Sequence, residues 1–141
     1  MGKVTGIGGV FFKSTNPEKS KEWYRSHLGI KSGPYGGTFE WRKSSNPDEK
    51  GFTAWNPFKE DTDYYEPSKK DFMINYRVQG LESLLEELKS NGVQVIGEME
   101  VYEYGKFGWI MDPDGIKIEL WEPIDDIYDQ MGDDSMTNRM Y

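Results

Sequence analysis

The residues of this sequence best able to do chemistry lie near its C-terminal end, in the segment Trp109 to Trp121. Glu119 and Trp121 alternate with aliphatic residues, so in an extended strand the carboxylate and the indole share one face. A face exposed only to water seldom carries Trp, which indicates a concave surface. A carboxylate there could hold a ligand amine or, with its pKa raised by apolar surroundings, move a proton. The alternative is a strand glutamate beside Lys117 on a partly wet face.

No other side chain stands in a recognisable catalytic motif. The only histidine, His27, is expected as an exposed residue at the end of a helix, where a cation interacts well with the helix dipole. The chain has no cysteine, which excludes thiolate nucleophiles, disulfides and cysteine zinc sites. No serine motif supports a catalytic triad. The segment from Gly6 to Gly9 resembles a dinucleotide-binding loop only weakly, because it lies inside a strand rather than between a strand and a helix.

A tight turn positions the candidate face. In Asp112-Pro113-Asp114-Gly115 the proline presets a turn conformation and the glycine supplies a positive φ, which favours a hairpin. The order strand, helix, three strands occurs twice, with a spacing of about 64 residues that pairs Gly9 with Met73. The expected elements are a strand at 4–13, a helix at 17–27, strands at 37–42 and 51–58, a connector at 61–70, a strand at 72–78, a helix at 81–91, and three strands within 93–121.

The segment DPDGIKIELWEP, residues 112–123, resembles the last hairpin of the vicinal oxygen chelate superfamily, which includes glyoxalase I, bleomycin-resistance proteins and extradiol dioxygenases. The resemblance implies an α+β fold in which two βαβββ units form a curved, cup-shaped mixed sheet. We expect one domain of this kind over 1–123, with unit one at about 3–60 and unit two at about 71–123. An acidic C-terminal tail, 124–141, follows, helical in part and frayed at its end, or else a lid or dimer arm.

The resemblance also locates the places where metal-dependent members carry their ligands, and Glu119 stands at one of them. The other three places fall at Gly9, Met73 and either Thr53 or Trp55, with Asn56 as the choice if the register slips by one. Glycine has no donor, and a thioether suits soft Cu(I) rather than a hard ion. We therefore expect no metal and no other cofactor.

A cup without an ion could still bind a ligand between aromatic rings. Phe11 has the strand parity of Gly9, and Asn75 and Arg77 have that of Met73; an arginine there would suit a ligand carboxylate. The alternative for each aromatic residue is ordinary core packing. The expected ligand-binding residues are Phe11, Trp55, Met73, Asn75, Arg77, Trp109, Glu119 and Trp121, and Glu119 is the catalytic residue if there is one.

The composition of the chain limits the kinds of partner that we expect it to bind. The 141 residues include 17 Lys and Arg against 25 Asp and Glu, so the net charge of −8 excludes nucleic acid and an anionic membrane as partners. No apolar run approaches the roughly 20 residues that cross a bilayer, and the N-terminus leads directly into a strand pattern. We expect a soluble, cytoplasmic homodimer. Aromatic residues make up 15% of the chain, more than so small a core needs, which leaves some to line a pocket.

Three functions are consistent with these residues. We favour binding of a small apolar or aromatic molecule without a metal. The second is a metal-dependent lyase, isomerase or dioxygenase of the same superfamily, with an ion held by Glu119 together with Glu98, Glu100 or Glu103. The third is a non-catalytic dimeric scaffold whose cup is filled by its own side chains. The size of any cavity beside Glu119 separates the first function from the third.

Overall fold

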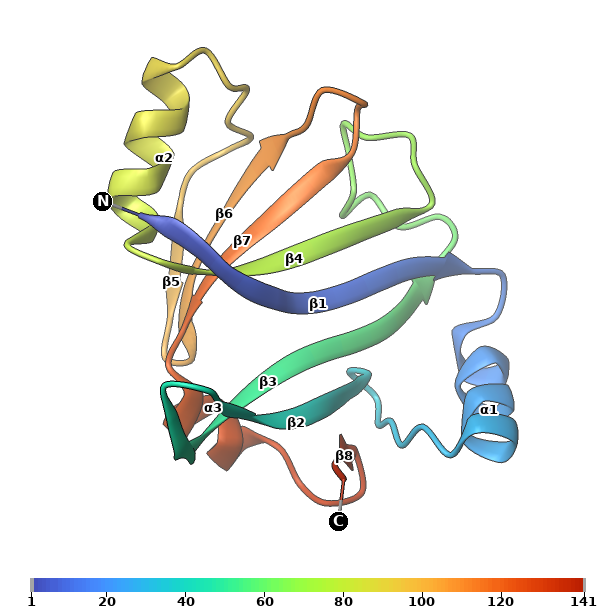
Figure 1. Ribbon diagram of the computed structural model, residues 1–141. Coiled ribbons are helices and arrows are strands. Elements are labelled where there is room, and N and C mark those ends of the chain that lie inside the picture. Colours follow the sequence, from blue (N-terminus) through green and yellow to red (C-terminus); the bar gives the residue numbers. More distant parts are fainter. Residues whose placement is uncertain (1, 141) are drawn as a thin grey trace.

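A computed structural model describes residues 2–140 and shows one eight-stranded mixed sheet with three helices in that range (Figure 1). The predicted α+β class is confirmed. The strand order is β5-β6-β7-β4-β1-β3-β2-β8. The elements are β1 (Lys3–Ser14), α1 (Pro17–Leu28), β2 (Gly37–Lys43), β3 (Asn46–Lys59), β4 (Phe72–Gln79), α2 (Leu81–Ser90), β5 (Glu100–Tyr102), β6 (Gly105–Met111), β7 (Lys117–Pro123), α3 (Asp125–Met131) and β8 (Thr137–Asn138). Across residues 2–140, none of the helices has the length and apolar character that crossing a bilayer requires.

The sheet is built from two related halves that meet where β1 pairs antiparallel with β4. In each half the first strand pairs in parallel with the last, β1 with β3 and β4 with β7, and a hairpin completes the half. The first half departs from the expected order of strand, helix and three strands, because only two strands, β2 and β3, follow α1, preceded by an isolated bridge between Gly33 and Gly36. The hairpin β2/β3 is also longer than expected. Pairing between Arg42 and Lys50 draws residues 46–50, which lie between the two expected strands, into β3.

Local signals place the ends of α1 as the sequence predicts. The Asn16 side-chain oxygen accepts a hydrogen bond from the Lys19 N–H at 3.1 Å, and Pro17 occupies the first turn, where its missing N–H costs nothing. The helix ends at Gly29, whose φ of 69° lies in the left-handed region. The same logic closes the turn before β7, where Gly115 has φ 79° and the Asp112 carboxylate accepts the N–H groups of Asp114 and Ile116.

The two long helices cover one face of the sheet. The leucines of α2 pack on a core formed by Val78, Leu81, Ile110 and Leu120, and Tyr24 of α1 lies against Trp55 with their ring centroids 5.0 Å apart. We call the opposite face the inner face; it carries Phe11, Phe52, Arg77, Glu119 and Trp121. The predicted alternation along β7 is confirmed, because Leu120 joins the core under α2 while Glu119 and Trp121 are buried on the inner face.

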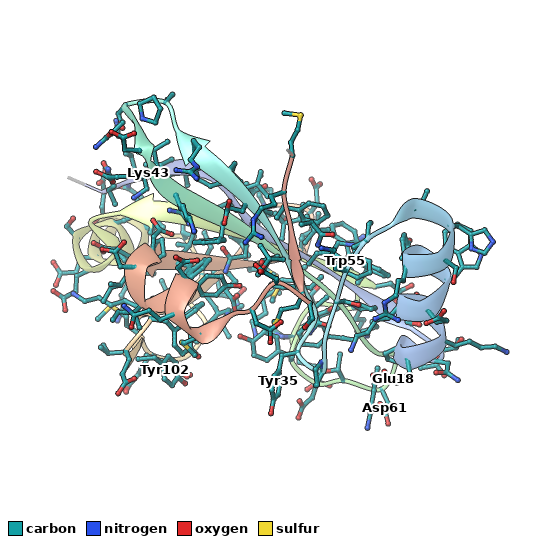
Figure 2. The ribbon with its side chains drawn as sticks, turned by 90° about the horizontal axis from the view of Figure 1, so that it is seen from below. Glu18, Tyr35, Lys43, Trp55, Asp61 and Tyr102 are labelled. Carbon is teal, nitrogen blue, oxygen red and sulfur yellow. The ribbon has the colours of Figure 1, made fainter. Side chains whose placement is uncertain are left out.

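Two segments cover the inner face. The connector between β3 and β4 lays Tyr64 and Tyr65 over one part, and α3 lies over another, where Tyr128 contacts Phe52 and Trp121 at centroid distances of 5.3 and 5.1 Å. Strand β8 then pairs in parallel with β2 and forms the edge of the sheet. The residues expected as a tail therefore form α3 and β8, which Figure 2 shows in front of the sheet.

Candidate functional site

Glu119 is the hub of a buried hydrogen-bond network on the inner face. Its Oε1 accepts from the Asn75 amide at 2.7 Å, and its Oε2 accepts from the Trp109 indole at 2.9 Å and from the Tyr64 hydroxyl. The strand register explains two of these contacts, because Asn75 on β4 and Trp109 on β6 stand directly opposite Glu119 on β7. Only 3% of Glu119 is exposed, so the three donors replace the water that a buried carboxylate would otherwise lack.

The charges around this hub shift the pKa values of its neighbours. Burial, reinforced by the negative charge of Glu119, raises the pKa of the Tyr64 hydroxyl, which keeps it a proton donor to that carboxylate. Burial lowers the pKa of Lys117, although the same carboxylate opposes the shift. The Lys117 ammonium donates to the Tyr64 carbonyl at 2.7 Å and lies over the rings of Tyr64 and Trp109, at 5.3 and 5.8 Å from their centroids. The network therefore fastens the connector to the sheet.

The donor set around Glu119 does not fit a hard divalent ion. Such an ion needs three or four converging oxygen or nitrogen ligands, whereas the Glu119 oxygens already accept three hydrogen bonds. Across the sheet, Gly9 faces Asn75 on one side and Ala54 on the other, and neither Gly9 nor Ala54 has a side-chain donor. In the part of the chain that the structure describes, no three His, Cys, Asp or Glu residues lie close enough to share a metal. Glu98, Glu100 and Glu103 thus do not form a group of three metal-binding carboxylates with Glu119.

Arg77 is engaged by the chain itself. Its guanidinium forms a bidentate pair with Asp125 of α3, at 3.0 and 2.7 Å, and donates to the Phe52 carbonyl at 3.2 Å. It also lies over the rings of Trp41 and Trp121, at 4.9 and 5.7 Å from their centroids. Arg77 therefore anchors α3 to the inner face, and the fork formed by its two terminal nitrogens is occupied by Asp125.

Three other expected residues are used in packing. Trp55 lies on the outer face under α1, where Figure 2 labels it, because the odd-numbered residues of β3 point away from the inner face. Met73 is sealed in a core cluster with Phe11 and Tyr65. Trp121 donates to the Tyr104 carbonyl at 3.3 Å and stacks on Phe107. Of the eight expected residues, only Phe11 lines the apolar cavity described next.

An apolar cavity of about 450 Å³ lies between the first half of the inner face and the C-terminal segment. Its floor comes from β1, β2 and β3, and its roof from α3 and the residues that lead to β8. Most of the wall is aromatic, aliphatic or thioether surface. The lining residues are Phe11, Tyr35, Gly37, Thr38, Phe52, Ala54, Asn56, Tyr104, Tyr128, Asp129, Met131, Gly132, Met136 and Thr137.

A few polar groups face or border this cavity without a partner from the protein. The hydroxyls of Tyr104 and Tyr128 have no hydrogen-bond partner among residues 2–140, and neither has the buried Oδ1 of Asn56. Burial raises the pKa of Tyr128 to about 12, so its hydroxyl is a neutral donor at physiological pH. The sequence did not lead us to predict that these residues line a cavity. The even-numbered residues of β3, which share one face of the strand, and the apolar residues within 127–136 were the features that could have indicated it.

Comparison with solved structures shows the same fold at low sequence identity. Methylmalonyl-CoA epimerase from Mycobacterium tuberculosis matches with 22% identity and a TM-score of 0.56, over 89% of this chain and 93% of that one. A variant of the Streptomyces coelicolor methylmalonyl-CoA epimerase in complex with 2-nitronate-propionyl-CoA matches with 14% identity and a TM-score of 0.60, over 86% and 99%. The Mn(II)-bound glyoxalase from Novosphingobium aromaticivorans matches with 15% identity and a TM-score of 0.55, over 86% and 40%.

The family is shown by the sequence. No protein of curated function matches the chain significantly. The sequence profile of one superfamily, however, matches residues 7–120, which reach from β1 to β7 and include both halves of the sheet. The chain therefore belongs to the Glyoxalase/Bleomycin resistance protein/Dioxygenase superfamily.

Proposed function

We propose that this protein binds a small, largely apolar or aromatic molecule, without a metal, in the cavity between the inner face and α3. The observation that carries the proposal is the cavity itself, about 450 Å³ with walls formed by Phe11, Phe52 and Tyr128 among others. That size lies within the range of small-molecule sites, which are mostly apolar with a few fixed polar groups. Here Asn56, Tyr104 and Tyr128 are the polar groups that orient the ligand.

The charged residues of the cavity wall favour a ligand without phosphate groups, unlike the CoA compound that one structural neighbour contains. No Lys, Arg or His is among the residues that line the cavity, and the one ionised side chain there is Asp129. Phosphate groups are recognised by cationic forks and ammonium groups, which this wall does not provide. We therefore propose that the ligand lacks phosphate groups.

Binding rather than turnover fits the residues best. Glu119, the candidate acid or base, is sealed behind three donors and is not among the residues that line the cavity. A general base must lie within hydrogen-bond reach of the proton that it removes. The alternative of a scaffold whose cup is filled by its own side chains fits only the half of the inner face around Glu119. The other half of that face borders the cavity.

A cavity-filling variant tests the proposal. Ala54→Phe adds a ring to the cavity wall, whereas Val10→Phe adds comparable bulk to the neighbouring strand β1 on the outer face, where Val10 is exposed. Calorimetric titration with a neutral probe, 1-naphthalenemethanol, should give saturable binding by the wild type and by Val10→Phe. We expect Ala54→Phe to weaken binding at least about tenfold, since the ring takes the space of the ligand.

Folding must be separated from binding in this test. Circular dichroism spectra and melting temperatures of both variants establish that each keeps the native sheet. Equal affinity for wild type and a folded Ala54→Phe, or no saturable binding of any naphthalene probe to the wild type, would refute the proposed function.

We also propose that the protein is a homodimer. Val4, Ile7 and Val10 of β1 are 40–50% exposed on the outer face between α1 and α2, and a row of aliphatic side chains of this kind is suited to burial against a second copy. Sedimentation equilibrium should then give twice the monomer mass of 16.4 kDa, and Ile7→Lys should give the monomer mass. A monomer mass for the wild type would contradict this proposal.

A further inference from the structure

We infer that the ligand of the cavity carries a protonated amine on its aromatic or apolar body. The inference rests on the proposed binding function and deepens it by naming the ligand's charge. It follows from the charge of the wall, from how aromatic rings are used elsewhere on the inner face, and from an acceptor that the protein leaves without a donor.

Aromatic clusters elsewhere on the inner face hold a cation that the protein supplies. The Arg77 guanidinium lies over Trp41 and Trp121, and the Lys117 ammonium lies over Tyr64 and Trp109, all within 6 Å of the ring centroids. Ring faces attract cations because of the negative potential of the π system. The cavity wall carries four further rings, Phe11, Phe52, Tyr104 and Tyr128, of which Phe52 and Tyr128 are in contact with each other, and among the described lining residues there is no Lys or Arg. A ligand cation would supply the charge that these rings lack.

The polar groups of the wall include an acceptor suited to an N–H donor. Asp129, on α3, places a carboxylate at the cavity. Its Oδ2 meets the Lys50 ammonium at 3.3 Å, in a pair exposed enough to be weak, and Oδ1 is left for a ligand ammonium.

The roof of the cavity adds a negative field. Residues 125–134 contain five aspartates and no Lys or Arg. Other elements face them with Arg77 and Lys43 at Asp125, Lys50 at Asp129 and Arg139 at Asp134, whereas within residues 2–140 no ion pair involves Asp126 or Asp133. With a net charge of −8 for the whole chain, this surface attracts cations and repels anions on approach.

Three probes with one skeleton test the inference. Wild-type protein is titrated calorimetrically at neutral pH and low salt with 1-naphthylmethylamine, 1-naphthalenemethanol and 1-naphthoate, which are cationic, neutral and anionic. We expect the amine to bind about tenfold more tightly than the alcohol, and the carboxylate to bind most weakly. Added salt should narrow the gap between the amine and the carboxylate.

A matched pair of variants locates the effect. Asp129→Asn should weaken binding of the amine about threefold and leave the alcohol unchanged, whereas Asp126→Asn removes the same charge from the same helix outside the cavity wall and should change neither. An alcohol that binds as tightly as the amine, or an amine affinity that Asp129→Asn leaves unchanged, overturns the inference while the proposed binding function stands. If none of the three probes binds, the proposed function fails and the inference fails with it.

Discussion

Neutralising Asp125 is the perturbation whose consequence can be worked out most fully. Asp125 begins α3 and pairs with Arg77 through two hydrogen bonds of 3.0 and 2.7 Å, while the Lys43 ammonium approaches it at 3.0 Å. Burial by itself would raise the pKa of Asp125, but Arg77 and Lys43 outweigh burial and hold that pKa below its usual range. Asp125→Asn keeps the shape of the side chain and removes its charge.

The cost follows from the burial of the pair. The Arg77 and Asp125 side chains are 7% and 9% exposed, and removing one partner of a buried ion pair costs about 3–5 kcal/mol. Arg77 keeps its hydrogen bond to the Phe52 carbonyl and its contacts with Trp41 and Trp121, so the lower end applies. We expect the free energy of unfolding to fall by about 3 kcal/mol and the melting temperature by about 10 °C.

Urea unfolding as a function of pH is the assay. A carboxylate whose folded-state pKa is lowered contributes stability that is present above its unfolded pKa, near 4, and is lost as the pH falls through the folded value. The wild type should therefore be more stable than Asp125→Asn at neutral pH, and the two should converge in acid as the pH falls below the lowered folded-state pKa of Asp125. Ligand binding should weaken in parallel, because Tyr128 and Asp129 are on the same helix.

Asp126→Asn is the control, because Asp126 is exposed on the same helix and should change stability by no more than about 0.5 kcal/mol. Equal losses for the two variants would show that the charge of α3 matters and the pair does not. A difference between wild type and Asp125→Asn that persists undiminished in strong acid would refute the role given to the carboxylate.

Two further predictions concern the hub and the C-terminal segment. Glu119→Gln should lower the free energy of unfolding by about 2–3 kcal/mol in urea titrations, because the amide cannot accept from all three buried donors. For the same network in the wild type, adding millimolar Mn²⁺ or Zn²⁺ should leave the melting temperature unchanged. Truncation after Pro123 should abolish probe binding in calorimetry and cost more than about 3 kcal/mol, because it exposes the buried Phe52 and Trp121 and leaves Arg77 unpaired; intact binding by the truncated chain would contradict the cavity assignment.

The hairpin, the helix ends and the placement of Glu119 could be predicted because each depends on a short run of residues. A proline and a glycine fix the turn before β7, and strict alternation then decides that Glu119 shares a face with Trp121 and not with Leu120. Asn16 and Gly29 mark the ends of α1 by the same kind of local chemistry. Such signals need no knowledge of which strands are neighbours.

The cavity could not be predicted in this way, because its wall depends on long-range pairing. The 64-residue spacing relates equivalent positions of the two halves, Gly9 and Met73 among them, but it does not say which residues face each other across the sheet; the β1–β4 register places Asn75 opposite Gly9 and Met73 opposite Phe11. A shift in that register between Ile7 and Gly9 is invisible in the sequence. On β3, alternation gave two possible faces and nothing local distinguished them. Trp55, the larger residue, lies under α1, and its neighbours Ala54 and Asn56 line the cavity.

The duplicated unit produces an asymmetric cup because different segments cover its two halves. In the second half the connector brings Tyr64 onto Glu119, and large rings from β6 and β7 fill the remaining space. In the first half the corresponding strand β3 offers the small Ala54, and the cover, α3, is tied to the sheet by an ion pair at one end and, through the residues that follow it, by the pairing of β8 with β2 at the other. These two attachments bring the cover to the sheet at its ends, and the small Ala54 leaves the space beneath it unfilled. The place of the hollow therefore follows from where α3 is attached and from the size of the side chains beneath it.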